Sequence, residues 1–116
     1  MADKKYIVNL GETLPEEFTI AIYGKKEGKK QRRIWKLDKV EKKYDNIEIN
    51  IDPKYEFMSV SFIQGMFSKS IEKMGKEEFY NKYSFVCDEH IKETIANEMM
   101  FMDLNLCDYK TNKKKK

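Results

Sequence analysis

The only histidine of the chain, His90, follows a cysteine, Cys87, by three residues. Such a pair can serve as a thiol nucleophile and its base. The pattern places Cys87 at the end of a buried strand and His90 in the first turn of a helix, so we favour structural roles. The second cysteine, Cys107, also lies among apolar residues, and one histidine with two distant cysteines makes a poor zinc cage. The sequence therefore predicts two buried thiols, no metal site and no cofactor.

Two carboxylates on a predicted strand are the other candidates for catalysis. Glu48 and Asp52 lie two residues to either side of Asn50, and in an extended strand they share one face. Paired carboxylates can perform general acid–base chemistry. No third catalytic group lies near them in the sequence, and alternation with isoleucine alone explains them as polar positions of a half-buried strand. We therefore do not predict an enzyme.

Basic residues are concentrated in residues 24–43, which hold ten Lys/Arg against three acids, a net +7 in a chain whose overall charge is +3. The segment 24–30 is similar to a phosphate-binding loop, but it lacks the required spacing and the hydroxyl residue after the lysine. A basic surface of this kind can attract nucleic acid or an acidic protein. Its members are Lys25, Lys29, Lys30, Arg32, Arg33 and Lys36.

Length and composition indicate one globular domain. The chain has 116 residues, of which 41% are apolar, enough for a core. We assign residues 1–109 to this domain and residues 110–116, with five lysines and no acid, to a disordered tail. No apolar run resembles a signal peptide or a membrane span, so we expect a cytoplasmic protein that does not bind membranes. The oligomeric state is left open, a dimer included.

The first half of the chain is expected to form a hairpin and a helix. Apolar alternation predicts strands over residues 6–10 and 18–22. About six residues connect them, which favours an antiparallel β-hairpin. Residues 29–44 then carry apolar side chains at intervals of three and four, which predicts an amphipathic helix with a basic outer face.

Residues 46–75 organise the rest of the chain. Isoleucines at every second position of residues 46–52 predict a strand, which Pro53 ends. Apolar residues of the next segment form one helical face, with a capping-box spacing between Ser61 and Gln64 and a helix end at Gly75.

The C-terminal part continues the alternation of helix and strand. A short helix is expected over residues 76–83, a buried strand over 84–87, and a last helix that Asp88 caps. The apolar stripe of that helix consists of Ile91, Ile95, Met99 and Met102. Its methionines, Met100 included, form either core or an adaptable contact surface. Residues 101–107 fit a strand as well as a helix. Together these elements predict an α/β fold in which helices pack on a small mixed sheet.

The sequence "NIEINIDPKYEFMSVSFIQGMFSKSIEKMGKEEFYNKYSF" resembles the STAS-like domain family of unknown function, a relative of the STAS domains that act as anti-sigma-factor antagonists. The shared pattern is a strand that ends in an acidic residue, a short loop, a serine-rich turn and a helix that opens with an aromatic residue. The resemblance covers about residues 34–100. It implies a small α/β sandwich that binds a protein partner, such as a histidine-kinase-like ATPase or another signalling protein.

The resemblance also implies where the partner binds, namely at the corner formed by Ser59, Ser61, Phe62 and Gln64. STAS domains carry a phosphorylated serine there, and a phosphate at a helix start meets free N–H groups. The usual Asp-Ser-Ser-Gly is replaced by residues 59–62, with Val60 at the phosphorylated position, so Ser61 is the candidate phosphosite.

Two other interpretations stay open at this stage. Helix capping alone explains the serines at residues 59 and 61. The second functional hypothesis is a small basic binding or inhibitor protein, of a kind that phages encode, which uses the helix at residues 25–43 and the lysine tail.

Overall fold

The computed structural model describes the main chain of residues 4–115 and the side chains of residues 4–104. Its larger sheet contains β1 (Lys5–Asn9), β3 (Asn46–Asn50) and β5 (Tyr83–Val86), in the order β1-β3-β5 and with both pairings parallel. A second, two-stranded parallel sheet consists of β2 (Ala21–Ile22) and β4 (Phe57–Met58). The predicted α/β class, with helices packed on a small sheet, is confirmed.

The two N-terminal strands follow one another as predicted, but they do not form a hairpin. β1 pairs with β3 and β2 pairs with β4, so the described sheets are parallel and not mixed. The connection between β1 and β2 starts with a 3-10 turn, η1 (Leu10–Glu12), and buries Leu10, Leu14 and Phe18 in the core. Burial of this connection leads the chain away from β1, which is why the predicted antiparallel pairing is wrong.

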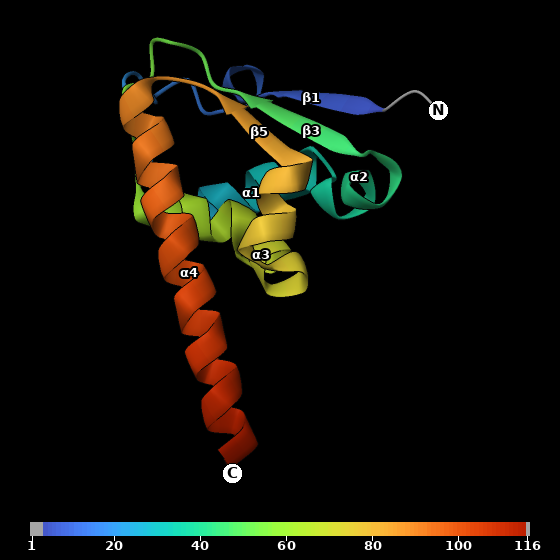
Figure 1. Ribbon diagram of the computed structural model, residues 1–116. Coiled ribbons are helices and arrows are strands. Elements are labelled where there is room, and N and C mark those ends of the chain that lie inside the picture. The colour runs from blue at the N-terminus through green and yellow to red at the C-terminus, as the bar shows by residue number, and fades with distance from the viewer. Residues whose placement is uncertain (1–3, 116) are drawn as a thin grey trace.

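Helices cover one face of the three-stranded sheet. In Figure 1, α1 (Lys25–Ile34) and α3 (Val60–Lys82) lie beneath the sheet. They belong to the connections β1 to β3 and β3 to β5, as parallel neighbours require. Side chains such as Ile47 and Ile49 point into the core, whereas Ile7 is exposed and Glu48 forms an ion pair with Lys5, N–O 2.7 Å, on the other face. Glu48 therefore has the solvent-facing role that alternation predicted.

The predicted basic helix is divided into two helices. α1 begins at Lys25, four residues earlier than expected, and α2 spans Leu37–Lys43. Between them Lys36 adopts φ 53°, in the left-handed region, and its N–H donates to the carbonyl of Arg33. The turn lets Leu37 enter the core. A lysine at positive φ has no signal in the sequence, because the conformation disfavours side chains with a Cβ.

Glycine ends the first part of α3, as predicted. Gly75 has φ 79°, and a short helix continues from there to Lys82, so the element consists of two helices joined at a kink. The predicted strand at residues 84–87 is also found, as β5. These positions were predictable because positive φ and short apolar runs depend on local sequence.

The last helix, α4 (Glu89–Lys115), starts where the sequence placed it. The carboxylate of Asp88 accepts from the N–H of His90 at 2.8 Å, and Ile91, Ile95 and Met99 are buried. Residues 101–107 are helical, which decides between the two alternatives. The helix continues through residues 110–115, where a disordered tail was predicted, and extends away from the other elements (Figure 1). Lys116 and the side chain of Cys107 lie outside the described residues.

α1 and α3 cross with their main chains in contact at two glycines. A Cβ atom built on Gly28 would lie 2.3 Å from the carbonyl oxygen of Phe62, and one on Gly65 would lie 2.2 Å from that of Lys25. Real Cβ atoms do not approach this closely, so both positions need glycine. The crossing explains why Gly28 lies inside α1, although the predicted helix began one residue after it.

We expect Gly65→Ala to destabilise the fold by about 1–3 kcal/mol, because the added methyl group meets backbone of α1 that cannot move aside cheaply. In an uncrowded helix the same change stabilises by about 1 kcal/mol, so the sign of the effect is the test. Urea denaturation measures it. Gly11→Ala is the control, since its Cβ would lie 3.5 Å from that of Asp52, an ordinary contact. A Gly65→Ala variant as stable as the wild type would disprove the close crossing.

Candidate protein-interaction surface

Ser59 is the N-cap of α3, which agrees with the capping interpretation for this serine, whereas the capping-box spacing had placed the cap at Ser61. Its Oγ accepts hydrogen bonds from the N–H of Phe62 at 3.1 Å and from that of Gly24 at 3.3 Å. Its own N–H donates to the carbonyl of Ile22 at 2.8 Å. Ser59 therefore joins the start of α3 to the end of β2 and the start of α1. The predicted capping box between Ser61 and Gln64 is wrong because the helix begins two residues earlier.

The other predicted partner-binding residues have different environments. Ser61 is half-buried, with its Oγ 3.0 Å from that of Ser59. Gln64 is half-buried and donates to the carboxylate of Glu98 on α4 at 3.0 Å. Phe62 is fully buried, so it cannot contact a partner at the surface. Ser61 is thus the member of this group best placed for recognition, and Phe62 is a core residue.

A set of four exposed apolar residues lies close to the two serines through main-chain contacts, and the sequence analysis did not identify it. Its members are Ile20, Tyr23, Phe57 and Val60, with exposed fractions of 49, 52, 47 and 45%. We call these four residues the corner patch.

Main-chain contacts hold the corner patch together. Phe57 donates its N–H to the carbonyl of Ile20 at 3.1 Å, and the β2–β4 pairing sets Ala21 beside Phe57. Tyr23 lies between Ile22 and Gly24, both of which bond to Ser59, and Val60 follows Ser59 directly. The sequence assigned Ile20 to the buried face of a longer strand. The apolar alternation of residues 18–22 was misleading because β2 has only two residues, so the strand does not extend to position 20.

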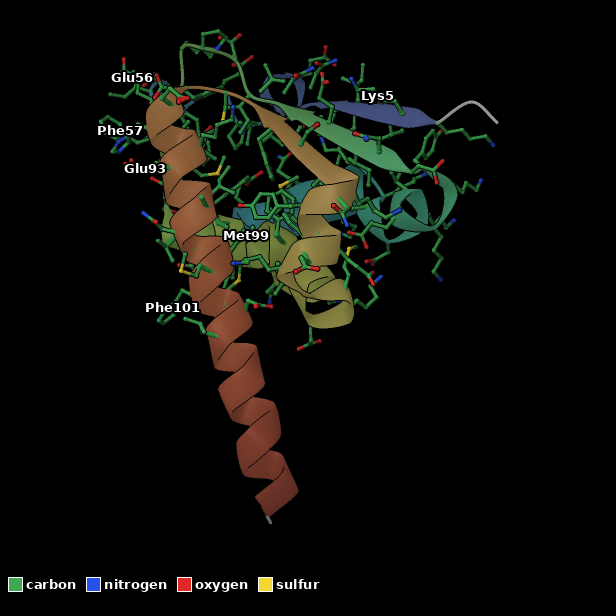
Figure 2. The ribbon with its side chains drawn as sticks, viewed as in Figure 1. Lys5, Glu56, Phe57, Glu93, Met99 and Phe101 are labelled. Atoms are coloured by element: carbon green, nitrogen blue, oxygen red, sulfur yellow. The ribbon has the colours of Figure 1, made fainter. Side chains whose placement is uncertain are left out.

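Acidic side chains and His90 border the corner patch. The Phe57 ring packs edge-on against the His90 ring, with 5.1 Å between centroids. In Figure 2, Glu56, Phe57 and Glu93 project to the same side of the upper part of α4. An apolar centre with a polar rim is the arrangement that protein interfaces commonly have.

The predicted basic patch is only partly at the surface. Lys25, Lys29, Lys30, Arg33 and Lys36 are exposed. Arg32 is buried, and its guanidinium donates to the carbonyl of Met66 at 2.8 Å, to Ser70 Oγ at 2.8 Å and to Asp38 at 2.7 Å. Arg32 is therefore not part of the exposed basic surface, because the close crossing of α1 and α3 brings these acceptors within its reach.

A buried carboxylate, Glu41, is the centre of a polar cluster that includes Arg32. One Glu41 oxygen accepts from Ser70 and, at 2.5 Å, from the hydroxyl of Tyr83, and it lies 3.6 Å from Arg32. Lys73 lies 3.3 Å from the other oxygen. Burial, and then the charge of Glu41, raise the pKa of the Tyr83 phenol well above its ordinary value, so that Tyr83 stays a donor. The cluster links α1, α2, α3 and β5, and we assign it a structural role.

A hollow of about 610 Å³ lies at the carboxyl ends of β1, β3 and β5, where α/β proteins commonly bind ligands. Asp52 and Cys87 line it, whereas Glu48 does not, so this hollow does not bring the two predicted carboxylates together. Burial raises the pKa of the Cys87 thiol, which disfavours the thiolate that nucleophilic catalysis needs.

Comparisons of the chain with protein-family models, with curated proteins and with solved structures find no match. The resemblance to STAS-like domains therefore stays a prediction. Within residues 4–115, no helix has the length and apolar character needed to cross a membrane.

We expect Ser59→Ala to lower the free energy of unfolding by about 1 kcal/mol, the usual cost of a lost N-cap. Ser61→Ala is the matched control, and its cost is expected to be smaller because Ser61 accepts no main-chain N–H. Urea denaturation of both variants measures the difference. A larger loss in Ser61→Ala would place the cap at Ser61 instead.

We expect Arg32→Met to destabilise the chain by about 3–5 kcal/mol, because Glu41 would keep a buried charge without its buried cation. The double variant Arg32→Met/Glu41→Leu should recover part of this loss, since no buried carboxylate is left. Asp38→Asn should cost no more than about 1 kcal/mol, because the Asp38 side chain is largely exposed. Chemical denaturation tests all three, and equal losses in Arg32→Met and Asp38→Asn would refute the buried role of Arg32.

Proposed function

We propose that this chain is a non-enzymatic regulatory module of STAS-like type that binds a protein partner through the corner patch. The observation that carries the proposal is that main-chain contacts at the start of α3 bring together four residues with half-exposed apolar side chains. Single exposed apolar residues are common on protein surfaces, but a group of them held together by main-chain contacts and bordered by polar side chains is typical of interaction sites. Tyr23 and Phe57 belong to the aromatic types that are enriched in interfaces.

The resemblance to STAS-like domains supports the same surface independently of the structure, because it implies partner binding at residues 59–64. It suggests a kinase-type ATPase or another signalling protein as the partner. The proposal includes a cytosolic location, where a thiol such as that of Cys87 stays reduced.

Ser61 is the residue through which the interaction would be regulated. It is the second residue of α3, where main-chain N–H groups lack partners within the helix. A phosphoryl group there would be stabilised by the helix N-terminus. It would also place a dianion beside Val60 in the corner patch, which opposes the burial of apolar surface by a partner.

The test compares two isoleucines of similar exposure. Ile20 lies in the corner patch and is 49% exposed, whereas Ile7 lies on the outer face of β1 and is 46% exposed. The tagged chain is used to recover partners from a lysate of the native host, and affinity for the recovered protein is then measured with each variant. We expect Ile20→Lys to weaken binding at least about 10-fold and Ile7→Lys to leave it unchanged.

A second pair of variants examines Ser61 in the same assay. We expect Ser61→Glu to weaken binding while the fold survives, and Ser61→Ala to bind as the wild type does. Equal affinity of the Ile20→Lys and Ile7→Lys variants would refute the corner patch as the binding site. Recovery of nucleic acid in place of protein, with binding that falls steeply with salt, would favour the basic binding protein instead.

A further inference from the structure

A small hollow between α1 and α3 is lined mainly by cationic side chains from these two helices. Its volume is about 250 Å³. The residues that line it are Lys29, Arg32, Arg33, Asp38, Gly65, Ser68 and Lys69. It shares no residue with the corner patch, and it unites three residues of the predicted basic patch, Lys29, Arg32 and Arg33, with Ser68 and Lys69 of α3, which the sequence analysis did not consider.

The crossing of the two helices accounts for this arrangement. On α1, Lys29 and Arg33 are four residues apart and therefore on one face. On α3, Ser68 and Lys69 lie three and four residues after Gly65, on the face that meets α1. Because Gly65 has no side chain and its main chain contacts α1, the two pairs face each other across the hollow.

The charge of the hollow is unbalanced. The carboxylate of Asp38 is paired with Arg32 at 2.7 Å, and this hydrogen bond is the main reason why the pKa of Asp38 lies below its ordinary value. Among the residues with described side chains, Lys29, Arg33 and Lys69 form no ion pair with an acid. Three cationic groups therefore line one hollow without an ion pair of their own, and the single carboxylate of the lining, Asp38, is paired with Arg32.

The guanidinium of Arg32 adds positive charge to the lining of the hollow. Arg32 is only 6% exposed, although it lines the hollow. Its Nε–H has no hydrogen-bond partner among the described residues. The Nε atom itself has almost no accessible surface, so a ligand in the hollow would meet the positive charge of the guanidinium and not this donor. Ser68 adds an exposed hydroxyl that can donate to an oxyanion.

We propose that the hollow between α1 and α3 binds the dianionic phosphate group of a phosphomonoester. Three unpaired cations and a hydroxyl match the charge and the oxygen atoms of such a group. The volume is below the range of about 300–1,000 Å³ that whole small-molecule ligands occupy, so it suits a phosphoryl group and not an entire nucleotide. A phosphodiester backbone carries one charge per phosphate and matches three clustered cations less well.

The experiment is a titration of the full ¹⁵N-labelled chain with inorganic phosphate and with a phosphoserine peptide at constant ionic strength, followed by NMR. We expect saturable shifts of amides in residues 29–33 and 65–69 with both probes. Arg33→Gln and Lys69→Gln should each weaken binding at least about 10-fold, the effect of losing a charged hydrogen bond. Lys30→Gln is the matched control, since Lys30 is an exposed lysine of α1 that does not line the hollow.

The phosphate and peptide arms distinguish the source of the group. Tighter binding of the peptide assigns the hollow to a phosphorylated protein, and equal binding assigns it to a free phosphorylated compound.

Equal weakening by Lys30→Gln, identical shifts with chloride, or the absence of saturation would overturn the proposal. Stronger competition by a single-stranded oligonucleotide than by phosphate would also overturn it, in favour of nucleic acid. All three substitutions are at exposed positions, so we expect the variants to fold. Urea denaturation checks that they do.

Discussion

The contact between the main chains of α1 and α3 at Gly28 and Gly65 is the constraint on which most of the helical layer depends. A methyl group at either position would lie within 2.3 Å of a carbonyl oxygen, so the helices can approach this closely only with glycine at both. The close approach allows the guanidinium of Arg32 to reach across to α3, where it binds Met66 and Ser70. It also creates the cationic hollow, whose two sides come from the two helices.

The buried polar cluster extends this constraint to the sheet. Arg32 belongs to α1, Glu41 to α2, Ser70 to α3 and Tyr83 to β5, so one set of hydrogen bonds specifies how four elements meet. Buried ion pairs contribute little net stability, since desolvation offsets their attraction, but they strongly disfavour arrangements in which one charge is left alone. We infer that the cluster selects this packing over alternatives that bury the same apolar side chains.

The two candidate surfaces suit different chemistry. The corner patch is apolar and lies where β2 and β4 end and α3 begins, and there Ser59 is occupied with capping. Under the proposed function, the division of roles between the two serines would keep the corner rigid and leave it open to a partner. Ser59 fixes the main chain, while Ser61 and the apolar side chains beside it stay accessible. The hollow is cationic and suits an anion, so a partner and a phosphate group would not compete.

Local sequence determined the elements and many of their ends. Alternating isoleucines defined β3, Gly75 ended the first part of α3 and Asp88 capped α4, because periodicity, positive φ and capping depend on neighbouring residues. Only the tertiary structure decided that β1 pairs with β3, that Arg32 is buried and that Ile20 is exposed. These outcomes rest on contacts between residues far apart in the chain, such as Arg32 with Ser70. A sequence pattern shows which residues share a face, but not which partner that face meets.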